Sequence, residues 1–436
     1  MNKINFKSLP LILLAVGIAI RVFISFNNSG FWSDELASIH FSKISVLDAI
    51  TRDNGGPLFQ MILRAWMSLF GESEHSIKAL PLTISIVSLV IVSRRFSKIV
   101  LALMVFNPFS IIAATQIKST ALFELATVVF VYANYFELFK SELFFPKLKK
   151  LILFLILLVL TNYISLLLVM VILFLLLFKT IKHKSFYYNL ILYFIFMAIA
   201  LFVKEEVLSF MNLSFLRGFS MDTLLSANRF LNLKNDIDFY CFLSSFILAG
   251  LVFLMNKRLY SLSFVTLILV LMYLVFSQLL GLNLLITRYM TPLSVLSVLS
   301  IESLFTSSTT QAKKRFVLSF IGLLLIGFNY FHINRITSNS WKLAANELCS
   351  QSEKITVWGH DGLKYYFSDS CAKVTSSLTQ IEKFCGQLVV SQIFKRHFTN
   401  NNSAYGEVEQ IKVFGANSTE PVFLLNRSCV LRESPR

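Results

Sequence analysis

Long apolar runs dominate this chain and leave few folds open to it. A helix needs about 20 apolar residues to cross the hydrocarbon of a bilayer, and such runs recur through residues 1–333. Apolar residues make up 56% of the 436 residues and charged residues 15%, whereas soluble domains carry about 25% charged residues. The composition therefore excludes a soluble globular chain. It also lacks the polar bias of disordered proteins and the repeats of fibrous ones.

The hydropathy pattern predicts a polytopic helical membrane domain with about eleven spans. None of them looks like a cleaved signal, because no small-residue cleavage site follows the first one. The predicted spans are 8–26, 76–93, 98–113, 119–139, 151–162, 164–178, 187–203, 237–255, 260–279, 289–306 and 316–333.

Polar interruptions divide two runs that are longer than one span. The run 98–139 is about twice a span, and polar residues interrupt it at 107–108 and 116–118, which predicts a hairpin. The run 151–178 is interrupted at Asn162, which predicts two short helices.

The basic residues gather in alternate loops of this eleven-span arrangement. Short cytoplasmic loops are enriched in Lys and Arg, so the N-terminus is predicted to be cytoplasmic, with 27–75 and 334–436 on the other side. The net charge of +16 is therefore a topology signal, and no nucleic-acid partner is predicted. The basic loop residues are Lys3, Lys7, Arg94, Arg95, Lys98, Lys140, Lys147, Lys149, Lys150, Lys179, Lys182, Lys184, Lys257, Arg258, Lys313, Lys314 and Arg315.

Composition changes at about residue 334, where charged residues, Ser, Asn and Thr become frequent. About 100 residues are enough for one small domain. Short runs of β-formers and of helical periodicity predict an α/β fold for 334–436. Strands are predicted at 354–358, 387–391, 410–414 and 422–425, and helices at 341–349 and 379–384.

Four of the five cysteines lie in this C-terminal segment. An even number of cysteines outside the cytoplasm favours two disulfides, with three connectivities open, over free thiols. No Cys-x-x-Cys pair is present, and no metal site is predicted. The candidates are Cys349, Cys371, Cys385 and Cys429.

The first external loop holds most of the acidic residues that a reaction would use. Asp34 and Glu35 precede apolar residues at roughly helical spacing, which predicts a helix on the membrane surface. A second surface helix is predicted over 58–70, after Pro57. Carboxylates at a helix start suit the helix dipole, so spacing alone favours an N-terminal cap over a catalytic role for the pair.

The residues of this loop resemble the GT-C glycosyltransferases, in the branch of the protein O-mannosyltransferases and lipid A aminoarabinose transferases. The resemblance runs through the first helix, the Trp-x-Asp-Glu motif, the Asp–Pro–Leu segment and Phe-Gly-x-Ser-Glu. Thr287–Pro292 resembles the family's Arg-Tyr-x-x-Pro stretch, and Trp341-Lys342 resembles the start of its soluble tail. The matching loop residues are Trp32, Asp34, Glu35, Asp53, Pro57, Leu58, Trp66, Phe70, Gly71, Ser73 and Glu74.

The resemblance implies an inverting transfer of a sugar from a polyprenyl phosphate to a hydroxyl outside the cytoplasm. Asp34 would be the base, and Glu35 would hold the acceptor or tune Asp34. No cofactor is predicted, and dependence on a divalent metal is left open. The acceptor is a lipid, a glycan or a protein, and the location is a bacterial inner membrane with the C-terminal domain in the periplasm.

The resemblance also implies a set of donor-binding residues near the outer boundary. Arg288 is the first candidate for the donor phosphate, because a guanidinium binds two phosphate oxygens at once; an interfacial arginine that snorkels to headgroups is the alternative. Lys118 and Lys78 are further phosphate candidates. The residues expected to contact the substrate are Tyr289, Asp53 and Gln116.

Three departures from the family pattern affect residues on the side of the site where the sugar donor is expected to bind. Gly55 and Gly56 stand where the family has proline, Lys78 stands where it has arginine, and the family's Arg and Tyr are missing from the segment after Gln116. The sugar is therefore left open. Two other functions are also considered: a transporter of a lipid-linked sugar, and a degenerate transferase that only binds. Transporters usually place functional residues at the midplane on broken helices, whereas here the acids lie in a loop.

Arg21 and Glu124 are charged residues that lie within the predicted spans. Arg21 is about a turn from the outer end of the first span and is expected to snorkel. Glu124 is one turn into the fourth span, where it is expected to face a cavity, to be protonated or to snorkel.

Overall fold

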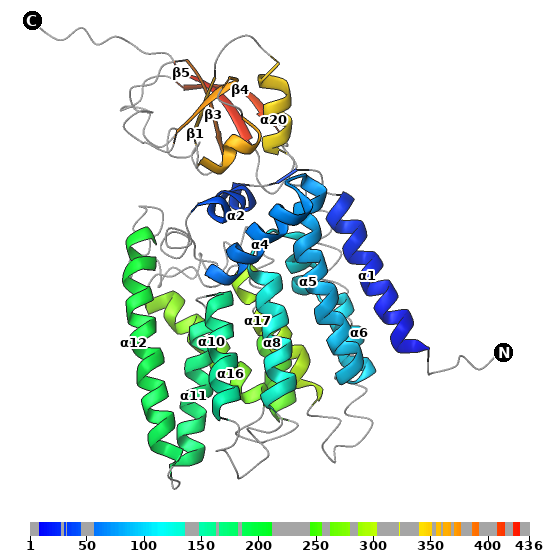
Figure 1. The fold of residues 1–436 in the computed structure, drawn as a ribbon, viewed down its shortest axis with the longest axis vertical. Coiled ribbons are helices and arrows are strands. Elements are labelled where there is room, and N and C mark those ends of the chain that lie inside the picture. Colours follow the sequence, from blue (N-terminus) through cyan, green and yellow to red (C-terminus); the bar gives the residue numbers. More distant parts are fainter. Residues whose placement is uncertain are drawn as a thin grey trace, which may run out of the picture.

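The computed structural model shows a helical bundle with a small sheet domain at one end, and two short helices between them (Figure 1). Several sequence predictions fall outside the described residues, among them Trp32, Asp53, the span 316–333 and the helix 379–384. The structure describes residues 8–27, 30–31, 33–44, 56–135, 148–162, 165–181, 185–211, 245–254, 262–279, 287–302, 322, 340–350, 355–358, 361–367, 370–375, 386–391, 408–414 and 422–427.

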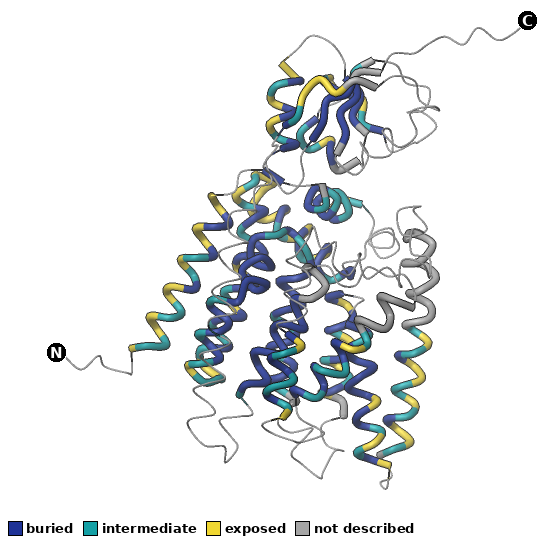
Figure 2. Tube along the Cα trace, turned by 180° about the vertical axis from the view of Figure 1, so that it is seen from behind, coloured by how far each residue is buried: buried dark blue, intermediate teal, exposed yellow. Residues whose placement is uncertain are grey.

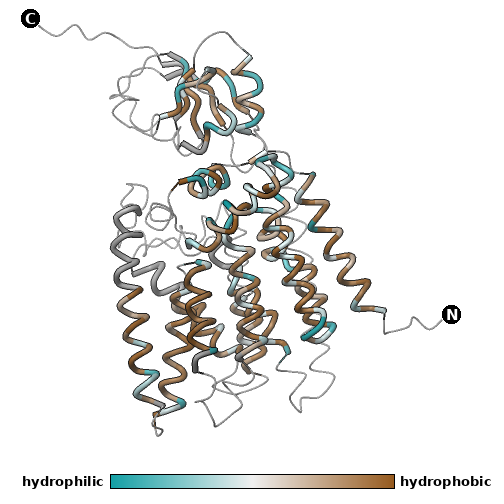
Figure 3. Tube along the Cα trace, in the orientation of Figure 1, coloured by the Kyte–Doolittle hydropathy of each residue, from teal (hydrophilic) through white to brown (hydrophobic). Residues whose placement is uncertain are grey.

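The bundle is made of apolar helices that run roughly side by side (Figures 1 and 3). A turn at 116–119 separates α7 from α8, and α10 ends at Thr161, just before Asn162, so both breaks fall where polar residues predicted them. The helices are α1 (Leu9–Asn27), α5 (Glu74–Arg95), α6 (Lys98–Phe106), α7 (Pro108–Thr115), α8 (Thr120–Phe130) with a π-helical extension (Val131–Tyr135), α10 (Leu148–Thr161), α11 (Ser165–Thr180), α12 (Ser185–Met211), Ser245–Leu254, α16 (Leu262–Leu279) and α17 (Thr287–Ser300).

Among the described residues, α1 and α5 are each long and apolar enough to cross a membrane, and α6 with α7 would make a third span if the bent pair is counted as one. The outer surface of the bundle is apolar: Leu11 and Phe23 of α1 are 73% and 65% exposed. Figure 2 shows exposed positions along α1 and α12 at the two sides of the bundle. Such faces fit a membrane protein. The total of eleven spans stays a prediction.

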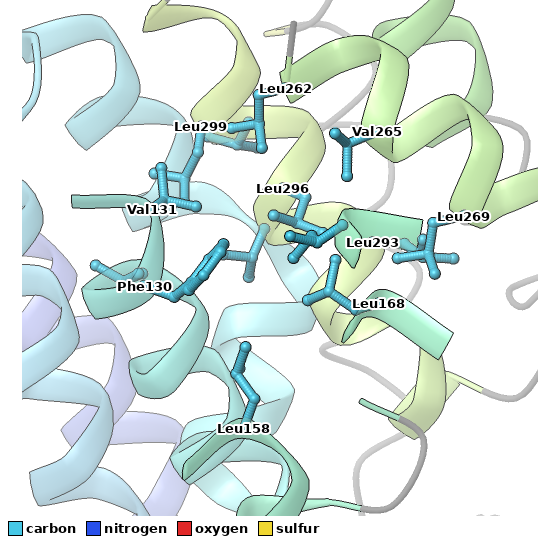
Figure 4. Packing of buried hydrophobic residues seen from close by; sticks show 14 of the residues in the cluster. Phe130, Val131, Leu158, Leu168, Leu262, Val265, Leu269, Leu293, Leu296 and Leu299 are labelled. Atoms are coloured by element: carbon cyan, nitrogen blue, oxygen red, sulfur yellow. The ribbon is translucent and has the colours of Figure 1, made fainter. Parts of the chain in front are cut away.

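The centre of the bundle is a close-packed apolar core. Its side chains come from helices distant in the sequence, such as Leu158 of α10, Leu168 of α11, Leu269 of α16 and Leu296 of α17, all of which are buried. Figure 4 shows these leucines and Phe130 among the side chains that fill the space between the helices. Because many helices contribute side chains to one core, the core fixes the positions of the helix ends.

The third predicted span, 98–113, is bent rather than straight. The axes of α6 and α7 differ by 57°. Pro108 opens α7, and proline restricts the residue before it to extended backbone. The side chain of that residue, Asn107, caps α7 through Oδ1, which accepts from Phe109 N at 3.0 Å and from the hydroxyl of Ser294 at 3.1 Å.

Arg21 is buried beside this break instead of snorkelling as expected. Nε donates to Ser85 Oγ, Nη1 donates to the carbonyls of Gly17 and Val105, and Nη2 donates to the carbonyl of Met104 and to Ser110 Oγ, at 2.7–3.2 Å. All five guanidinium N–H groups are thereby used. Two of the acceptors, the carbonyls of Met104 and Val105, lie at the end of α6 next to the bend.

Glu124 lies next to this arginine and is also fully buried. Ser110 Oγ accepts from Arg21 and donates to Glu124 Oε1 at 2.8 Å. Arg21 and Glu124 thus share one serine, so the Glu124 side chain belongs to the packing of α1, α7 and α8 rather than to the surface.

Two short helices lie between the bundle and the sheet domain (Figure 1). They are α2 (Ser33–Lys43) and α4 (Pro57–Phe70), where the two surface helices were predicted. In α4, Phe59 and Leu63 are buried while Met61 and Leu69 are exposed. Both faces of α4 are thus apolar, as expected for a helix that packs on protein and faces lipid.

The start of α4 touches the end of α10 backbone to backbone. Gly56, the residue before α4, has φ +86°, and a Cβ there would lie 2.7 Å from the carbonyl oxygen of Leu160 and 2.8 Å from that of Thr161. Only glycine permits both the conformation and the approach. At Gly56, the departure from the family pattern therefore has a structural reason.

The C-terminal segment forms a five-stranded sheet with the strand order β2-β1-β3-β5-β4. Strands β2, β1 and β3 are parallel, and β5 runs antiparallel between β3 and β4. The sequence predicted four of these strands and missed β2. The elements are α20 (Ser340–Leu348), β1 (Ile355–Trp358), the 3-10 helix η3 (Asp361–Tyr365), β2 (Ala372–Thr375), β3 (Gly386–Ser391), β4 (Val408–Phe414) and β5 (Val422–Arg427).

The sheet domain shares one hydrophobic cluster with the loop between α1 and α5, which the sequence predicts to be external. It joins Phe31 and Leu36 from the loop, Ile77 from α5, and Trp341 and Leu363 from the C-terminal segment, all buried. Helix α2 packs directly on η3. The sheet domain is therefore fixed to the loop by apolar burial, which contributes about 25 cal/mol per Å².

We predict that Gly56→Ala destabilises the protein more than Gly71→Ala does. Both glycines have positive φ, +86° and +82°, so each substitution incurs a backbone strain of about 1–3 kcal/mol. A Cβ at Gly71 would meet nothing within 4 Å, whereas one at Gly56 would meet backbone at 2.7 Å. Thermal unfolding of both variants in detergent checks this, and equal melting temperatures would show that the contact with α10 is not restrictive.

Candidate functional site

The two carboxylates of the Trp-x-Asp-Glu motif lie in the first turn of α2. The Asp34 side chain is 41% exposed, and its Oδ2 lies 3.9 Å from Lys118 Nζ. Lys118 is in the turn between α7 and α8, and its side chain is 15% exposed. The hairpin turn thus places a cation beside a carboxylate that solvent can reach.

Glu35, unlike Asp34, is buried, with 3% exposure. Its Oε1 accepts from the backbone N–H of Ile117 at 3.0 Å. Adjacent carboxylates on α2 therefore contact adjacent residues of one turn, Glu35 through Ile117 and Asp34 through Lys118. The bond to Ile117 attaches α2 to the turn between α7 and α8.

Gln116 belongs to the same turn. Its side-chain Oε1 is buried and has no hydrogen-bond donor among the described residues. A buried amide oxygen without a partner costs free energy. A substrate hydroxyl in this position would satisfy it, in keeping with the substrate role expected for Gln116.

Lys78 lies below the loop, in α5, and is 4% exposed. Its Nζ is 5.5 Å from the ring centroid of Phe31, which is within the range of a cation–π contact. The carboxylates of Glu35 and Glu74 interact electrostatically with the Lys78 ammonium group. Lys78 is thus a buried cation held by the loop, unlike the more open Lys118.

Arg288 and Tyr289 fall in the first turn of α17, whose described side chains begin only later in the helix. Helix α17 packs on α7 and α8, the helices that carry the Lys118 turn. Asp53 lies outside the described residues. The structure therefore brings together Asp34, Glu35, Gln116 and Lys118, with Lys78 beneath them, and the donor role of Arg288 stays a prediction.

A second polar cluster joins the loop to the sheet domain. Glu74 Oε2 accepts from Lys342 Nζ at 2.9 Å and from Gly30 N at 3.3 Å, and Glu74 Oε1 accepts from the Tyr366 hydroxyl at 3.1 Å. The Tyr366 oxygen in turn accepts from Phe31 N at 2.7 Å. Glu74 and Lys342, singled out separately by the resemblance, form one ion pair across 268 residues of sequence.

Tyr366 was missed in the sequence, where nothing distinguishes it from other tyrosines. Burial, together with the neighbouring Glu74 carboxylate, raises its pKa above the ordinary value. Burial and the carboxylates of Glu74 and Glu72 raise the pKa of Tyr365 to about 12. Both hydroxyls therefore stay protonated at neutral pH and can donate to the loop.

One disulfide is present among the described residues, between Cys349 and Cys371, with a Cα–Cα distance of 5.0 Å. Cys385 and Cys429 lie outside the described residues, so the second expected disulfide stays a prediction. Within the part of the chain that the structure describes, no group of three or more His, Cys, Asp or Glu residues could hold a metal ion.

Seven chains of solved structure resemble this one. ArnT from Cupriavidus metallidurans in the apo state is 11% identical, with 95% of this chain and 97% of that chain covered and a TM-score of 0.47. The same protein bound to undecaprenyl phosphate is 11% identical, with the same coverage and a TM-score of 0.44. At this identity and these scores, the likeness concerns the overall course of the chain.

No protein-family model matches the sequence, and no curated protein matches it either. Statements about chemistry therefore depend on the residues of the site.

We predict that Glu35→Gln folds normally and that Glu35→Ala is destabilised. A glutamine oxygen can still accept from Ile117 N, whereas alanine leaves this buried N–H unpaired at a cost of about 1–3 kcal/mol. Melting temperatures of the two variants in detergent, with membrane amounts from immunoblots, test this. If Gln and Ala behave alike, the bond to Ile117 does not hold α2 on the turn.

Proposed function

We propose that this chain is an inverting glycosyltransferase that moves a sugar from a polyprenyl phosphate to an acceptor hydroxyl at the outer face of the membrane. The observation that carries the proposal is the Asp34 carboxylate, open to solvent and 3.9 Å from Lys118. A base and a phosphate-binding cation are the two groups that such a transfer needs at the boundary of lipid and water.

The reaction assigns a distinct task to each group. Asp34 accepts the proton of the acceptor hydroxyl, whose oxygen attacks the anomeric carbon from the side opposite the phosphate. The bond from that carbon to the phosphate oxygen breaks, polyprenyl phosphate leaves, and the anomeric centre inverts. One carboxylate is sufficient, in contrast to the pair that most glycosidases use.

The positive charges stabilise the leaving phosphate. Lys118 lies beside Asp34, and we assign Arg288 to the phosphate as well, because a planar guanidinium can bind two of its oxygens. Lys78 is buried against Phe31. We propose that its positive charge acts on the site electrostatically, from beneath the loop. Glu35 orients Asp34, and Gln116, Tyr289 and Asp53 are the proposed contacts to the sugar or acceptor.

The N-terminus is proposed to be cytoplasmic and the C-terminal domain to be periplasmic. The positively charged loops support this orientation, as does the Cys349–Cys371 disulfide, since disulfides persist outside the cytoplasm. The acceptor class, whether lipid, glycan or protein, is the part that experiment must identify.

Transport is the second function to consider, because broken helices are common at transporter binding sites. The bend between α6 and α7 supplies such a break. However, the carbonyls of Met104 and Val105 beside the bend accept from Arg21, whose N–H groups are all used within the protein. The polar groups of the break therefore serve the packing of the bundle, which favours the transferase.

We predict that Asp34→Asn lowers the rate of transfer by about 100- to 10,000-fold, the contribution of a positioned base. Wild type and variant are expressed in a strain without the native copy, and masses of envelope lipids, glycans and secreted proteins are compared. A mass increment formed only with wild type identifies sugar and acceptor. Glu72→Gln, which alters an exposed carboxylate paired with Lys43, is the matched control and retains the product.

Two outcomes would contradict this mechanism. If Asp34→Asn makes the product at the wild-type rate, Asp34 is only a helix cap. If wild type makes no glycoside but a lipid-linked sugar changes sides of the membrane, the protein is a transporter.

We predict that Lys118→Met raises the KM for the lipid-linked donor by about 10- to 100-fold, the effect of losing one hydrogen bond to a charged group. The melting temperature should hardly change, because a partly exposed pair is worth under about 1 kcal/mol. Lys43→Met removes an exposed cation of the same region and is the control. An unchanged donor KM in Lys118→Met would remove Lys118 from the phosphate site.

A further inference from the structure

The contacts between the sheet domain and the first external loop converge on the residues just before Asp34. Gly30 and Phe31 donate their backbone N–H groups to Glu74 and to Tyr366, respectively. These two residues connect α1 to α2, so their placement sets where α2 begins. A backbone held at this point fixes the direction from which Asp34 enters the site.

The Phe31 side chain has no exposed surface. Its ring centroid is 5.3 Å from that of Tyr365 and 6.2 Å from that of Tyr366, and Lys78 Nζ lies 5.5 Å from it. Two rings of the sheet domain and one cation of the bundle therefore hold a single side chain of the loop.

Glu74 is the acceptor that ties these parts together. It receives hydrogen bonds from the loop (Gly30 N), from α20 (Lys342 Nζ) and from the residue after η3 (Tyr366 Oη). A carboxylate accepts charge-assisted hydrogen bonds, which are stronger than neutral ones. These bonds therefore stabilise the contact in addition to the packing of apolar side chains. We call Glu74, Lys342 and Tyr366 the loop clamp.

The disulfide joins the two sheet-domain parts of the loop clamp. Cys349 follows α20, which carries Lys342, and Cys371 follows Tyr366 and precedes β2. The bond spans 22 residues and fixes the distance between α20 and η3. A covalent link at this point keeps Lys342 and Tyr366 aimed at the same carboxylate.

On the basis of the proposed transferase function, we infer that the C-terminal domain is part of the active-site scaffold, with Tyr366 as a positioning residue that holds Asp34 in place through Phe31 and Glu74. The Cys349–Cys371 disulfide maintains this arrangement. The domain thus acts on the rate of transfer and not on the affinity for the lipid donor, whose phosphate ligands lie on the bundle.

Tyr366→Phe tests this with little disturbance, because it removes only the hydroxyl that bridges Phe31 and Glu74. We expect kcat to fall by about tenfold, since a misplacement of about 1 Å can cost about 100-fold, while the donor KM changes by less than about twofold. Amide exchange in α2 should become faster. Tyr365→Phe is the matched control, because that hydroxyl donates to the carbonyl of Glu72 instead, and it should leave kcat and exchange unchanged.

The disulfide is tested with Cys349→Ser/Cys371→Ser in the full-length protein. The double variant should show the same signature as Tyr366→Phe, with lower kcat, a constant donor KM and faster exchange in α2. Wild-type kcat and exchange would overturn the role of the disulfide.

The outcomes separate this inference from the proposed function. If wild type transfers sugar and Tyr366→Phe matches it in kcat and in α2 exchange, the clamp role is overturned while the transferase remains. If wild type transfers no sugar, the proposed function fails, and the exchange of α2 amides still reports whether Tyr366 holds the loop. A fall in kcat equal for Tyr365→Phe and Tyr366→Phe would also overturn the specific role of Tyr366.

Discussion

A guanidinium within an apolar bundle imposes the strictest constraint on this fold. The charge of Arg21 costs several kcal/mol to bury unless every N–H finds an acceptor. The acceptors come from α1, from α5, from the end of α6 and from α7, so one side chain holds four helices in register. The bend at Pro108 and the burial of Arg21 belong together, because the Met104 and Val105 carbonyls that accept from the arginine lie next to the bend.

The first external loop is held between two such organised regions. Below it, the hairpin turn that follows the bent helix contacts Glu35 through Ile117 N and Asp34 through Lys118. Above it, the sheet domain holds Phe31 and Gly30 through Tyr366 and Glu74. A helix of only 11 residues would not be stable alone in water, so α2 depends on both contacts.

Local signals in the sequence predicted much of this arrangement. Polar residues within apolar runs predicted the turns at 116–118 and at Asn162, and both surface helices were visible from apolar spacing. The short strand β2 was missed because its first two residues, Ala372 and Lys373, are poor strand formers, unlike those of the equally short β1. Arg21 was misjudged because its acceptors lie as far as 89 residues away, and Tyr366 was missed because its partner Phe31 is 335 residues distant. Tertiary contacts of this kind leave no local pattern.

The burial of Arg21 also has a consequence for how the chain is assembled. Translation delivers α1 before Val105 and Met104, which follow Arg21 by 84 and 83 residues. Until the bent pair of helices arrives, the newly made first helix carries a charge with no protein acceptor from α6. It must keep that charge hydrated, or remain beside the insertion machinery, until its partners are synthesised. The same bonds that lock the finished bundle therefore dictate an order of events during its biogenesis.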